Sequence, residues 1–315
     1  MDPVQGVGLA AEVAGDVPEQ ALEAFVRLDP AGGEVPVEPA DAGPPGSLAS
    51  MTDSAPQIPR DSVTLSGGAR MPLLGFGTWQ IKGDEAVAAT SAALEAGYRH
   101  LDTATIYGNE AEVGRALADS GLARDDVFVT TKCPPHLAGR EIETLEQSLE
   151  MLRLEQVDLW LIHWTPDEGA GVAIWEQFVE ARDRGLAREL GVSNYPAVLV
   201  DELLDATGVK PAVNQVEWSP FLFDAEVVAQ HRSREIVLEG YSALRGGTLE
   251  DPTIGAIADR LGRTPAQVIV RWHLQHGIVV IPKSVRADRI RSNADVGGFA
   301  LSAADMAAVD ALGRG

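Results

Sequence analysis

The sequence predicts an α/β fold of the (β/α)8 TIM-barrel class, and three observations support this prediction. Short apolar runs that have the length of buried strands recur about every 30 residues from residue 73 onward. A segment with helical periodicity follows most of these runs closely, which favours parallel strands joined by crossover helices. Polar residues follow several of the runs, at the ends where a barrel of this class carries its active site.

The predicted barrel begins with a β-hairpin and then alternates strands with helices. In the segment SVTLSGGARMP, Val63 and Leu65 alternate with polar residues, and Gly67 and Gly68 permit the positive φ of a tight turn. The eight strands are predicted at residues 73–77, 98–103, 127–132, 157–163, 189–193, 212–217, 236–241 and 278–282. The helices are predicted at residues 84–96, 110–120, 140–152, 172–184, 196–206, 224–232, 253–261, 265–275, 286–294 and 302–312. Because no GxGxxG motif opens a βαβ unit, the sequence does not support a Rossmann domain.

Composition argues against several classes of protein. The chain has 315 residues, 45% of them hydrophobic, and a mean hydropathy of -0.01, which suffices for one barrel with a large core. Apolar runs stay well below the roughly 20 residues of a membrane span, and the N-terminus MDPVQGVGLAAEV lacks the pattern of a signal peptide. The net charge of -22 argues against a nucleic-acid partner, and the single cysteine, Cys133, fits a reducing cytoplasm.

Residues 1–60 are predicted to be a separate extension, and residues 61–315 the barrel. The extension holds ten acidic and two basic residues, so it contributes -8 of the net charge of -22. Because it is rich in Pro, Gly and Ala, we expect it to be mostly disordered. The pattern at 18–28 also allows a short helix with apolar side chains on one face, either a docking helix or part of a tail with no partner.

Four polar residues are candidates for catalysis. Asp102 and Tyr107 lie in HLDTATIYGNE, Lys132 ends VFVTTK, and His163 ends DLWLIH. A lysine ammonium near a tyrosine favours the phenolate, so we expect Lys132 to lower the pKa of Tyr107 below its usual value of about 10. Asp102 would keep Lys132 charged and oriented, and His163 would hydrogen-bond the substrate oxygen. Such a proton-donating group, with no metal and no nucleophile, indicates redox chemistry on a carbonyl, in which Tyr107 donates the proton as hydride arrives.

Each of these residues also has an ordinary structural interpretation. Asp102 could cap a helix, Lys132 could be a surface charge, and His163 could be a hydrogen-bonded residue of the core. The occurrence of all four at strand ends of one barrel favours the catalytic interpretation. A lyase or isomerase with Lys132 as a Schiff-base amine is a further alternative, but a carboxylate partner opposes the lowered pKa that this chemistry requires.

An ordered series of motifs connects the chain with a known family. GFGTW, YRHLDTATIYGNEAEVG, VTTK, SLEMLRLEQVDLWLIHW, GVSNY, VNQVEWSP and IPKS occur in this order within residues 75–284. The chain resembles the aldo-keto reductases over residues 62–312, in particular the small bacterial members that include the diketogluconate reductases. The resemblance places the family's catalytic tetrad on the four polar residues above. It implies a nicotinamide cofactor, usually NADPH, bound without a Rossmann fold.

The resemblance also implies where the cofactor binds. Ser193, Asn194 and Gln215 would hold the carboxamide, and Tyr241 would stack beneath the nicotinamide ring. The full set of implied cofactor residues is Thr78, Ser193, Asn194, Gln215, Tyr241, Ser242, Leu244, Lys283, Ser284, Arg286, Arg289 and Asn293.

The segment IPKSVRADRIR supplies positive charge in an otherwise acidic chain. Lys283 and Ser284 follow the last strand, where barrels often bind phosphate, and Arg286 and Arg289 suit a 2′-phosphate and adenine. Because no acidic residue stands where an NAD site would bind the ribose hydroxyls, NADPH is favoured over NADH. The alternative is a solvated basic start of a helix, although cations there oppose the helix dipole.

Departures from the family pattern bear on specificity. Ala243 replaces a proline of the family, and we expect the nearby Arg245 to contact phosphate. The chain ends soon after the last predicted helix, where relatives extend over the substrate. We therefore expect an open, permissive pocket walled by Trp79 and Trp164, with Phe76 nearby. The alternative for the two tryptophans is ordinary barrel packing.

These observations together predict an NADPH-dependent reductase that converts aldehydes or ketones to alcohols. We expect a cytoplasmic monomer that acts on a small-molecule carbonyl substrate, with no metal, no nucleic-acid partner and no membrane association. The main alternative is a catalytically weak barrel that senses NADPH and regulates a partner. Only the acidic extension supports that alternative, and the intact set of four polar residues argues against it.

Overall fold

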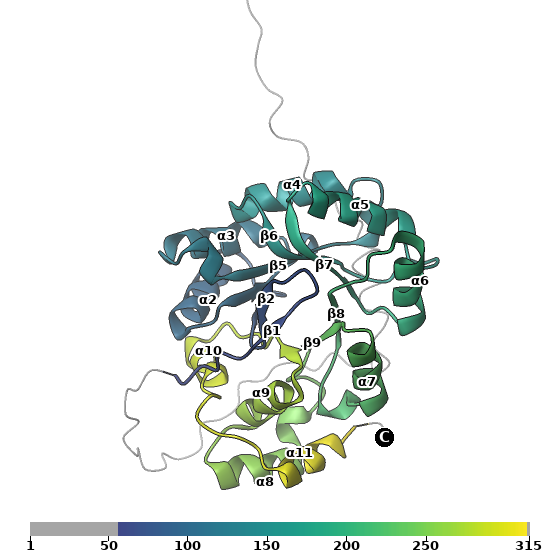
Figure 1. The fold of residues 1–315 in the computed structure, drawn as a ribbon. Coiled ribbons are helices and arrows are strands. Elements are labelled where there is room, and N and C mark those ends of the chain that lie inside the picture. The colour runs from purple at the N-terminus through teal and green to yellow at the C-terminus, as the bar shows by residue number, and fades with distance from the viewer. Residues whose placement is uncertain (1–55, 314–315) are drawn as a thin grey trace, which may run out of the picture. The chain divides into compact units, whose positions relative to one another are not determined.

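Eight parallel strands form the centre of the structure, and helices surround them (Figure 1). The computed structural model describes residues 56–313. The strands are β3 (Phe76–Gly77), β4 (His100–Asp102), β5 (Phe128–Cys133), β6 (Val157–Ile162), β7 (Ala187–Ser193), β8 (Val213–Glu217), β9 (Val237–Tyr241) and β10 (Val279–Val280). They are hydrogen-bonded in chain order from β3 to β10, as crossover helices between neighbouring parallel strands require.

The first and last strands close this sheet into a barrel. Leu74, just before β3, forms a parallel bridge with Val280 of β10. The Gly75 amide donates to the Val280 carbonyl over 2.9 Å, and the Val280 amide donates to the Leu73 carbonyl over 2.8 Å. The predicted (β/α)8 barrel is therefore confirmed, and all eight predicted runs contain a strand.

The helices follow the predicted segments closely. They are α2 (Gly83–Ala96), α3 (Glu110–Asp119), α4 (Glu141–Leu152), α5 (Val172–Asp183), α6 (Ala197–Thr207), α7 (Ala225–Ser233), α8 (Pro252–Leu261), α9 (Pro265–His276), α10 (Ala287–Ala294) and α11 (Ala303–Asp310). Short 3-10 turns lie between these elements: η1 (Thr105–Tyr107) follows β4, and η2 (Arg124–Asp126) precedes β5. No helix within residues 56–313 is long and apolar enough to cross a membrane.

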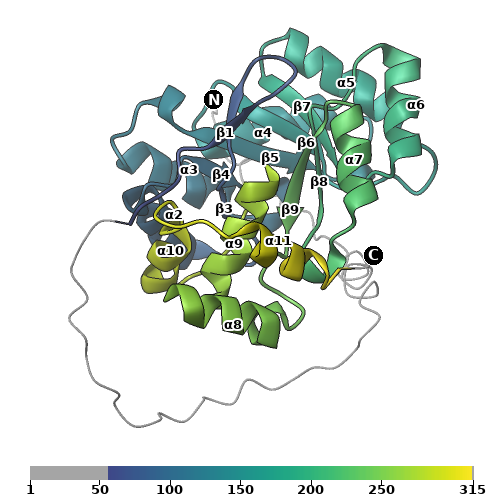
Figure 2. The ribbon, with the colours of Figure 1, turned by 60° about the horizontal axis from the view of Figure 1, so that its bottom comes forward.

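Local sequence signals explain where α9 begins and ends. Thr264 and Gln267 form a reciprocal capping box, and Pro265 occupies the first turn. Gly277 ends the helix in the left-handed conformation, with φ 69°. The last helix, α11, lies beside α8 in both views (Figures 1 and 2), and its Asp310 accepts hydrogen bonds from two side chains of α9.

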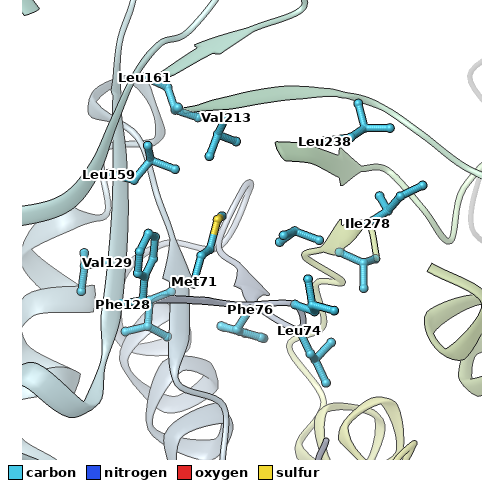
Figure 3. Close-up of a cluster of buried hydrophobic side chains, with 14 of the residues drawn as sticks. Met71, Leu74, Phe76, Phe128, Val129, Leu159, Leu161, Val213, Leu238 and Ile278 are labelled. Carbon is cyan, nitrogen blue, oxygen red and sulfur yellow. The ribbon is translucent and has the colours of Figure 1, made fainter. Parts of the chain in front are cut away.

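The predicted hairpin covers the N-terminal ends of the barrel strands. Strands β1 (Ser62–Thr64) and β2 (Arg70–Pro72) pair antiparallel. Met71 of β2 is fully buried and lies at the centre of the apolar side chains in Figure 3. Glu189, near the start of β7, accepts the backbone N–H groups of Gly67 and Ala69, each over 3.1 Å. The opposite end of the barrel, where the strands end, is therefore left for the site.

Contacts with the barrel begin before the predicted boundary at residue 61, at Gln57. The Gln57 amide donates to the Asp295 carboxylate over 2.8 Å, and Ile58 packs against the core. The predicted disorder and the short helix at 18–28 lie outside the described residues.

Candidate active site

The four candidate catalytic side chains come from three neighbouring strands and the turn after one of them. Asp102 is the last residue of β4, and Tyr107 ends η1 directly after it. Lys132 is the penultimate residue of β5. The backbone N–H of His163, just past β6, donates to the Cys133 carbonyl over 2.9 Å and extends the β5–β6 ladder. Because all these strands are parallel, the four residues meet at one end of the barrel.

Lys132 and Asp102 form a buried ion pair. The Lys132 Nζ donates to Asp102 Oδ1 over 2.7 Å and to Oδ2 over 2.8 Å, and it also donates to the Thr103 carbonyl over 2.9 Å. The lysine side chain is 0% exposed and that of Asp102 is 2% exposed. Burial acts to lower the pKa of Lys132, but the Asp102 charge and hydrogen bonds outweigh it, so the pKa is raised and Lys132 is charged.

The expected low pKa of Tyr107 is not found. The Lys132 ammonium lies 5.1 Å from the centre of the Tyr107 ring, close enough for charge coupling. Nevertheless, burial raises the pKa of Tyr107 to about 12, because the opposing effect of Lys132 is smaller and Asp102 adds to the rise. The predicted direction of the pKa shift was wrong because the prediction considered the charge of Lys132 and did not consider the desolvation of Tyr107. Tyr107 is therefore a protonated phenol at neutral pH, the form that a proton donor needs.

His163 lies against Tyr107 and is uncharged. The two rings are 5.6 Å apart at an interplanar angle of 72°. Burial first, and then the Lys132 charge, hold the pKa of His163 well below its usual range. Its Nδ1 atom is buried and has no hydrogen-bond partner within the described part of the chain. A neutral imidazole carries one N–H, which can donate to a carbonyl oxygen placed beside Tyr107.

Gln215 has a partner that the sequence did not indicate. Its Nε2 donates to Asp102 Oδ2 over 2.8 Å, so this amide helps to orient the carboxylate that holds Lys132. The resemblance instead assigned Gln215 to the cofactor carboxamide, and that role remains a prediction. A polar residue in the middle of a mostly buried strand, here β8, was the signal in the sequence.

Three further candidates for the carboxamide site are linked by hydrogen bonds. The Tyr241 hydroxyl donates to Asn194 Oδ1 over 3.1 Å, Asn194 Nδ2 donates to Ser193 Oγ over 3.0 Å, and Ser193 Oγ donates to the Gln215 carbonyl over 2.8 Å. Asn194 and Ser242 have φ of 60° and 59°, a conformation that non-glycine residues rarely adopt. Such strained turns cluster at ligand sites and fit a binding role for the ends of β7 and β9.

Two other predicted cofactor residues, Thr78 and Leu244, contact neighbouring parts of the barrel. Thr78 is buried, and its hydroxyl donates to the Asp102 carbonyl over 2.9 Å, which ties the loop after β3 to β4. Leu244 is half-buried and packs against the hydrophobic core. Neither placement tests a contact with the cofactor.

The basic segment after β10 divides into paired and unpaired cations. The Arg286 guanidinium binds both oxygens of Asp288 over 3.1 Å and 2.6 Å, and the Arg286 amide donates to Ser284 Oγ. Lys283 and Arg289 are exposed, and no carboxylate of the described residues lies within 4.0 Å of either charge. Asn293 on α10 is buried. Arg291 is likewise exposed and has no such partner, so Lys283, Arg289 and Arg291 are the unpaired cations of this segment in the described residues.

The pocket residues are only partly as expected. Phe76 does not line the pocket: it is 1% exposed, packs edge-on against Tyr98 with ring centres 5.8 Å apart, and belongs to the apolar cluster of Figure 3. It alternates with Gly77, which pairs with the inward-facing Asp102, so Phe76 points to the helix layer. Trp79 is half-buried, with the Arg245 guanidinium 5.4 Å above its ring.

Trp164, the other predicted wall of the pocket, follows His163 directly. It is half-buried, and its ring is stacked with that of His163 at a centroid distance of 6.5 Å and an interplanar angle of 11°.

No group of three or more His, Cys, Asp or Glu side chains that could hold a metal ion is found in residues 56–313.

Comparison with protein families gives a match over the barrel. The model of the aldo/keto reductase family matches residues 73–314, which is the whole barrel after the hairpin. The chain belongs to the aldo-keto reductase family. The resemblance seen in the sequence motifs is therefore confirmed, and the protein is an oxidoreductase of a family that reduces carbonyl groups.

Individual aldo-keto reductases match over almost their full length. The chain is 46% identical over 266 residues to an aldo-keto reductase of Mycolicibacterium vanbaalenii, covering 83% of this chain and 95% of that protein. It is 43% identical over 265 residues to the 2,5-diketo-D-gluconic acid reductase B of a Corynebacterium species, covering 82% and 95%. The crystal structure of an aldo/keto reductase from Brucella melitensis superposes with a TM-score of 0.77 at 41% identity, covering 81% of this chain and 99% of that one.

Proposed function

We propose that this aldo-keto reductase reduces aldehydes or ketones to alcohols with NADPH and that Tyr107 is the general acid. One observation carries the proposal: the Lys132 ammonium, held by Asp102 at 2.7 Å, lies 5.1 Å from the centre of the Tyr107 ring. A neutral His163 packs edge-on against that ring, with the ring centres 5.6 Å apart. These groups can bind a carbonyl oxygen and deliver one proton to it.

The residues at the ends of β7, β8 and β9 and after β10 fit a nicotinamide dinucleotide. Asn194 and Ser193 offer amide and hydroxyl groups for a carboxamide, and Tyr241 offers a ring for stacking. Lys283, Arg289 and Arg245 have no carboxylate partner within 4.0 Å in the described region of this acidic chain. When bound, NADPH supplies the hydride that reaches the carbonyl carbon.

We expect the proton to pass from Tyr107 to the substrate oxygen. The imidazole N–H of His163 donates to the carbonyl oxygen and polarises it. The O–H bond of Tyr107 breaks as a new O–H bond forms on the substrate oxygen, which leaves a phenolate on Tyr107. The Lys132 ammonium stabilises this negative charge, and Asp102 keeps Lys132 in place. Solvent returns a proton to Tyr107 before the next cycle.

The preference for NADPH over NADH rests on the basic segment. Arg289 and Lys283 can pair with a 2′-phosphate, and a guanidinium fork suits two phosphate oxygens. Arg286 is already engaged by Asp288, so its contribution is expected to be smaller.

We also propose that the enzyme works as a monomer in the cytoplasm. Asp102, Tyr107, Lys132 and His163 all come from one chain, so the proposed chemistry needs no second copy. Cys133 is a buried free thiol whose pKa is raised to about 12 by burial, which makes it inert and compatible with a reducing compartment. Size-exclusion chromatography with light scattering tests the monomer.

A spectrophotometric screen tests the function. Oxidation of NADPH and of NADH is followed in parallel with aromatic aldehydes, aliphatic ketones and sugar-derived keto acids, the last because of the relative named 2,5-diketo-D-gluconic acid reductase B. We expect steady oxidation of NADPH with at least one class, and none in Tyr107→Phe. If NADPH binds but no carbonyl compound is reduced, the proposed activity is wrong and a cofactor-sensing role takes its place.

A further inference from the structure

Glu239 is a buried acidic residue in the barrel wall that the proposed reaction does not use. It lies on β9 directly opposite Gln215 of β8, the amide that holds Asp102 at 2.8 Å. Its side chain is 0% exposed. Within the described chain, neither of its carboxyl oxygens has a hydrogen-bond partner. A single acid within the otherwise apolar run IVLEGY was the signal of this residue in the sequence.

The surroundings of Glu239 give it no free positive charge. Its closest charged or ionisable contact is His100, whose Nε2 lies 3.7 Å from Glu239 Oε1. Burial first, and then the Lys132 charge, lower the pKa of His100 to about 3, so its ring is neutral. The nearest full cation is Lys132, which Asp102 already neutralises. On the other side, the partner of Glu239 in β10 is the apolar Val279.

A carboxylate without hydrogen bonds or a counter-ion is strongly disfavoured when it is fully buried. Burial first, and then the negative charge of Asp102, raise the pKa of Glu239 to about 8, while the nearby Gln215 amide and the Lys132 charge oppose this rise only in part. At neutral pH the cluster thus contains one negative charge on Asp102, one positive charge on Lys132, and uncharged Glu239 and His100. Ionisation of Glu239 would give this cluster of four residues a net charge of one negative unit.

We propose that Glu239 is a positioning residue that acts on Tyr107 through the Asp102–Lys132 pair: it is uncharged in the working enzyme, and a negative charge on it makes Tyr107 a weaker acid. The inference rests on the proposed role of Tyr107 as proton donor. When Glu239 loses its proton to solvent, the added charge raises the proton affinity of Lys132 and of Tyr107. Reduction therefore slows in alkaline solution before Tyr107 itself ionises.

The test compares Glu239→Gln with the wild-type enzyme, because glutamine has the shape of the uncharged acid and cannot ionise. Single-turnover oxidation of bound NADPH by a carbonyl substrate is measured at about pH 6.5 and about pH 9.5, on either side of the expected ionisation. The rate of the wild type is expected to fall by about threefold or more between these values, and that of Glu239→Gln to fall by less than about 1.5-fold. A loss of packing alone would lower both rates and leave their ratio unchanged.

Glu189→Gln is the matched control, because it makes the same change at a buried strand residue at the other end of the barrel. It is expected to keep the wild-type ratio of rates, and a ratio as flat as that of Glu239→Gln would overturn the proposal. A wild-type rate that does not fall between the two pH values would overturn it as well, whether or not Glu239→Gln folds.

A measurement without turnover separates this inference from the proposed function. The infrared difference spectrum between the two pH values should show loss of the carbonyl band of a protonated carboxylic acid in the wild type and in Glu189→Gln. The same band should be missing from the difference spectrum of Glu239→Gln. If all three spectra are alike, Glu239 does not ionise in this range and the inference fails, even if carbonyl reduction is established. If the band behaves as expected but no carbonyl is reduced, the proposed function fails and the effect of Glu239 on Tyr107 with it, but the ionisation of Glu239 stands.

Discussion

The two ends of the barrel each hold a carboxylate paired with a cation, but the groups around the two pairs differ. At the N-terminal end, Asp158 of β6 accepts from Arg124 over 2.6 Å and from the backbone N–H of Val129 over 2.8 Å. The remaining Arg124 hydrogen bonds go to two backbone carbonyls. At the C-terminal end, the Lys132–Asp102 pair is equally well bonded, but it stands among buried polar atoms that lack partners: Nδ1 of His163 and both oxygens of Glu239, as far as residues 56–313 show.

This difference separates stability from chemistry. A fully bonded ion pair at the N-terminal end fixes β5 against β6. The pair at the C-terminal end lies against a phenol and an imidazole whose pKa values are shifted by burial in opposite directions. Groups of this kind carry an energetic cost that a purely structural site avoids, and they concentrate where a barrel has its active site.

Removal of the acid should give the largest effect on activity. In Tyr107→Phe, the ring that packs against His163 stays, but the proton donor is lost. We expect kcat to fall by about 10³-fold, with the Kd for NADPH within about twofold of the wild type. Steady-state kinetics and fluorescence titration of NADPH measure the two quantities. A variant that retains normal turnover would exclude Tyr107 as the acid.

The next variants compare the two ion pairs directly. Asp102→Asn leaves Lys132 buried without its counter-charge, so we expect about 3–5 kcal/mol of lost unfolding free energy and about 10²-fold lower kcat from misplacement of the ammonium. Asp158→Asn removes the partner of the half-exposed Arg124 and should cost about 1–3 kcal/mol with little change in kcat. Denaturant unfolding and initial rates on both variants test this. If Asp158→Asn reduces kcat as strongly as Asp102→Asn, the two ends are not functionally distinct.

Arg289→Ala should have a smaller effect that is confined to the cofactor. Since Arg289 has no carboxylate partner in the described structure, we expect the KM for NADPH to rise by about tenfold and the KM for NADH by less than about twofold. Arg286→Ala is the matched control, and its effect should be smaller because Asp288 already binds that guanidinium. Equal changes for both cofactors in Arg289→Ala would remove its role at the 2′-phosphate.

The sequence predicted the strands and helices well, because apolar runs and their spacing determine the order of a barrel. It also placed Asp102, Lys132 and His163 correctly at strand ends, since parallel strands bring their C-terminal ends together. It could not give the sign of the pKa change at Tyr107, which depends on the balance between burial and a charge 5.1 Å from the ring centre.

Contacts between strands that are distant in sequence could not be predicted either. The hydrogen bond from Gln215 to Asp102 joins residues 113 positions apart, and only the closed barrel brings them together. Phe76 was predicted to lie near the pocket, but strand alternation turns it to the helix layer. Glu239 was overlooked because its strand was read as an apolar run.

The smallest effect on activity is expected at the closed end of the barrel. Met71 of the hairpin is fully buried among the apolar side chains of Figure 3, far along the strands from the catalytic groups. Met71→Ala leaves a cavity there, so we expect about 2–5 kcal/mol of lost unfolding free energy and kcat within about twofold of the wild type at a temperature where the variant is folded. Thermal unfolding and initial rates provide the measurement. A large loss of kcat in folded Met71→Ala would show that packing at the N-terminal end positions Tyr107 or Lys132, and that stability and chemistry are coupled along the whole barrel.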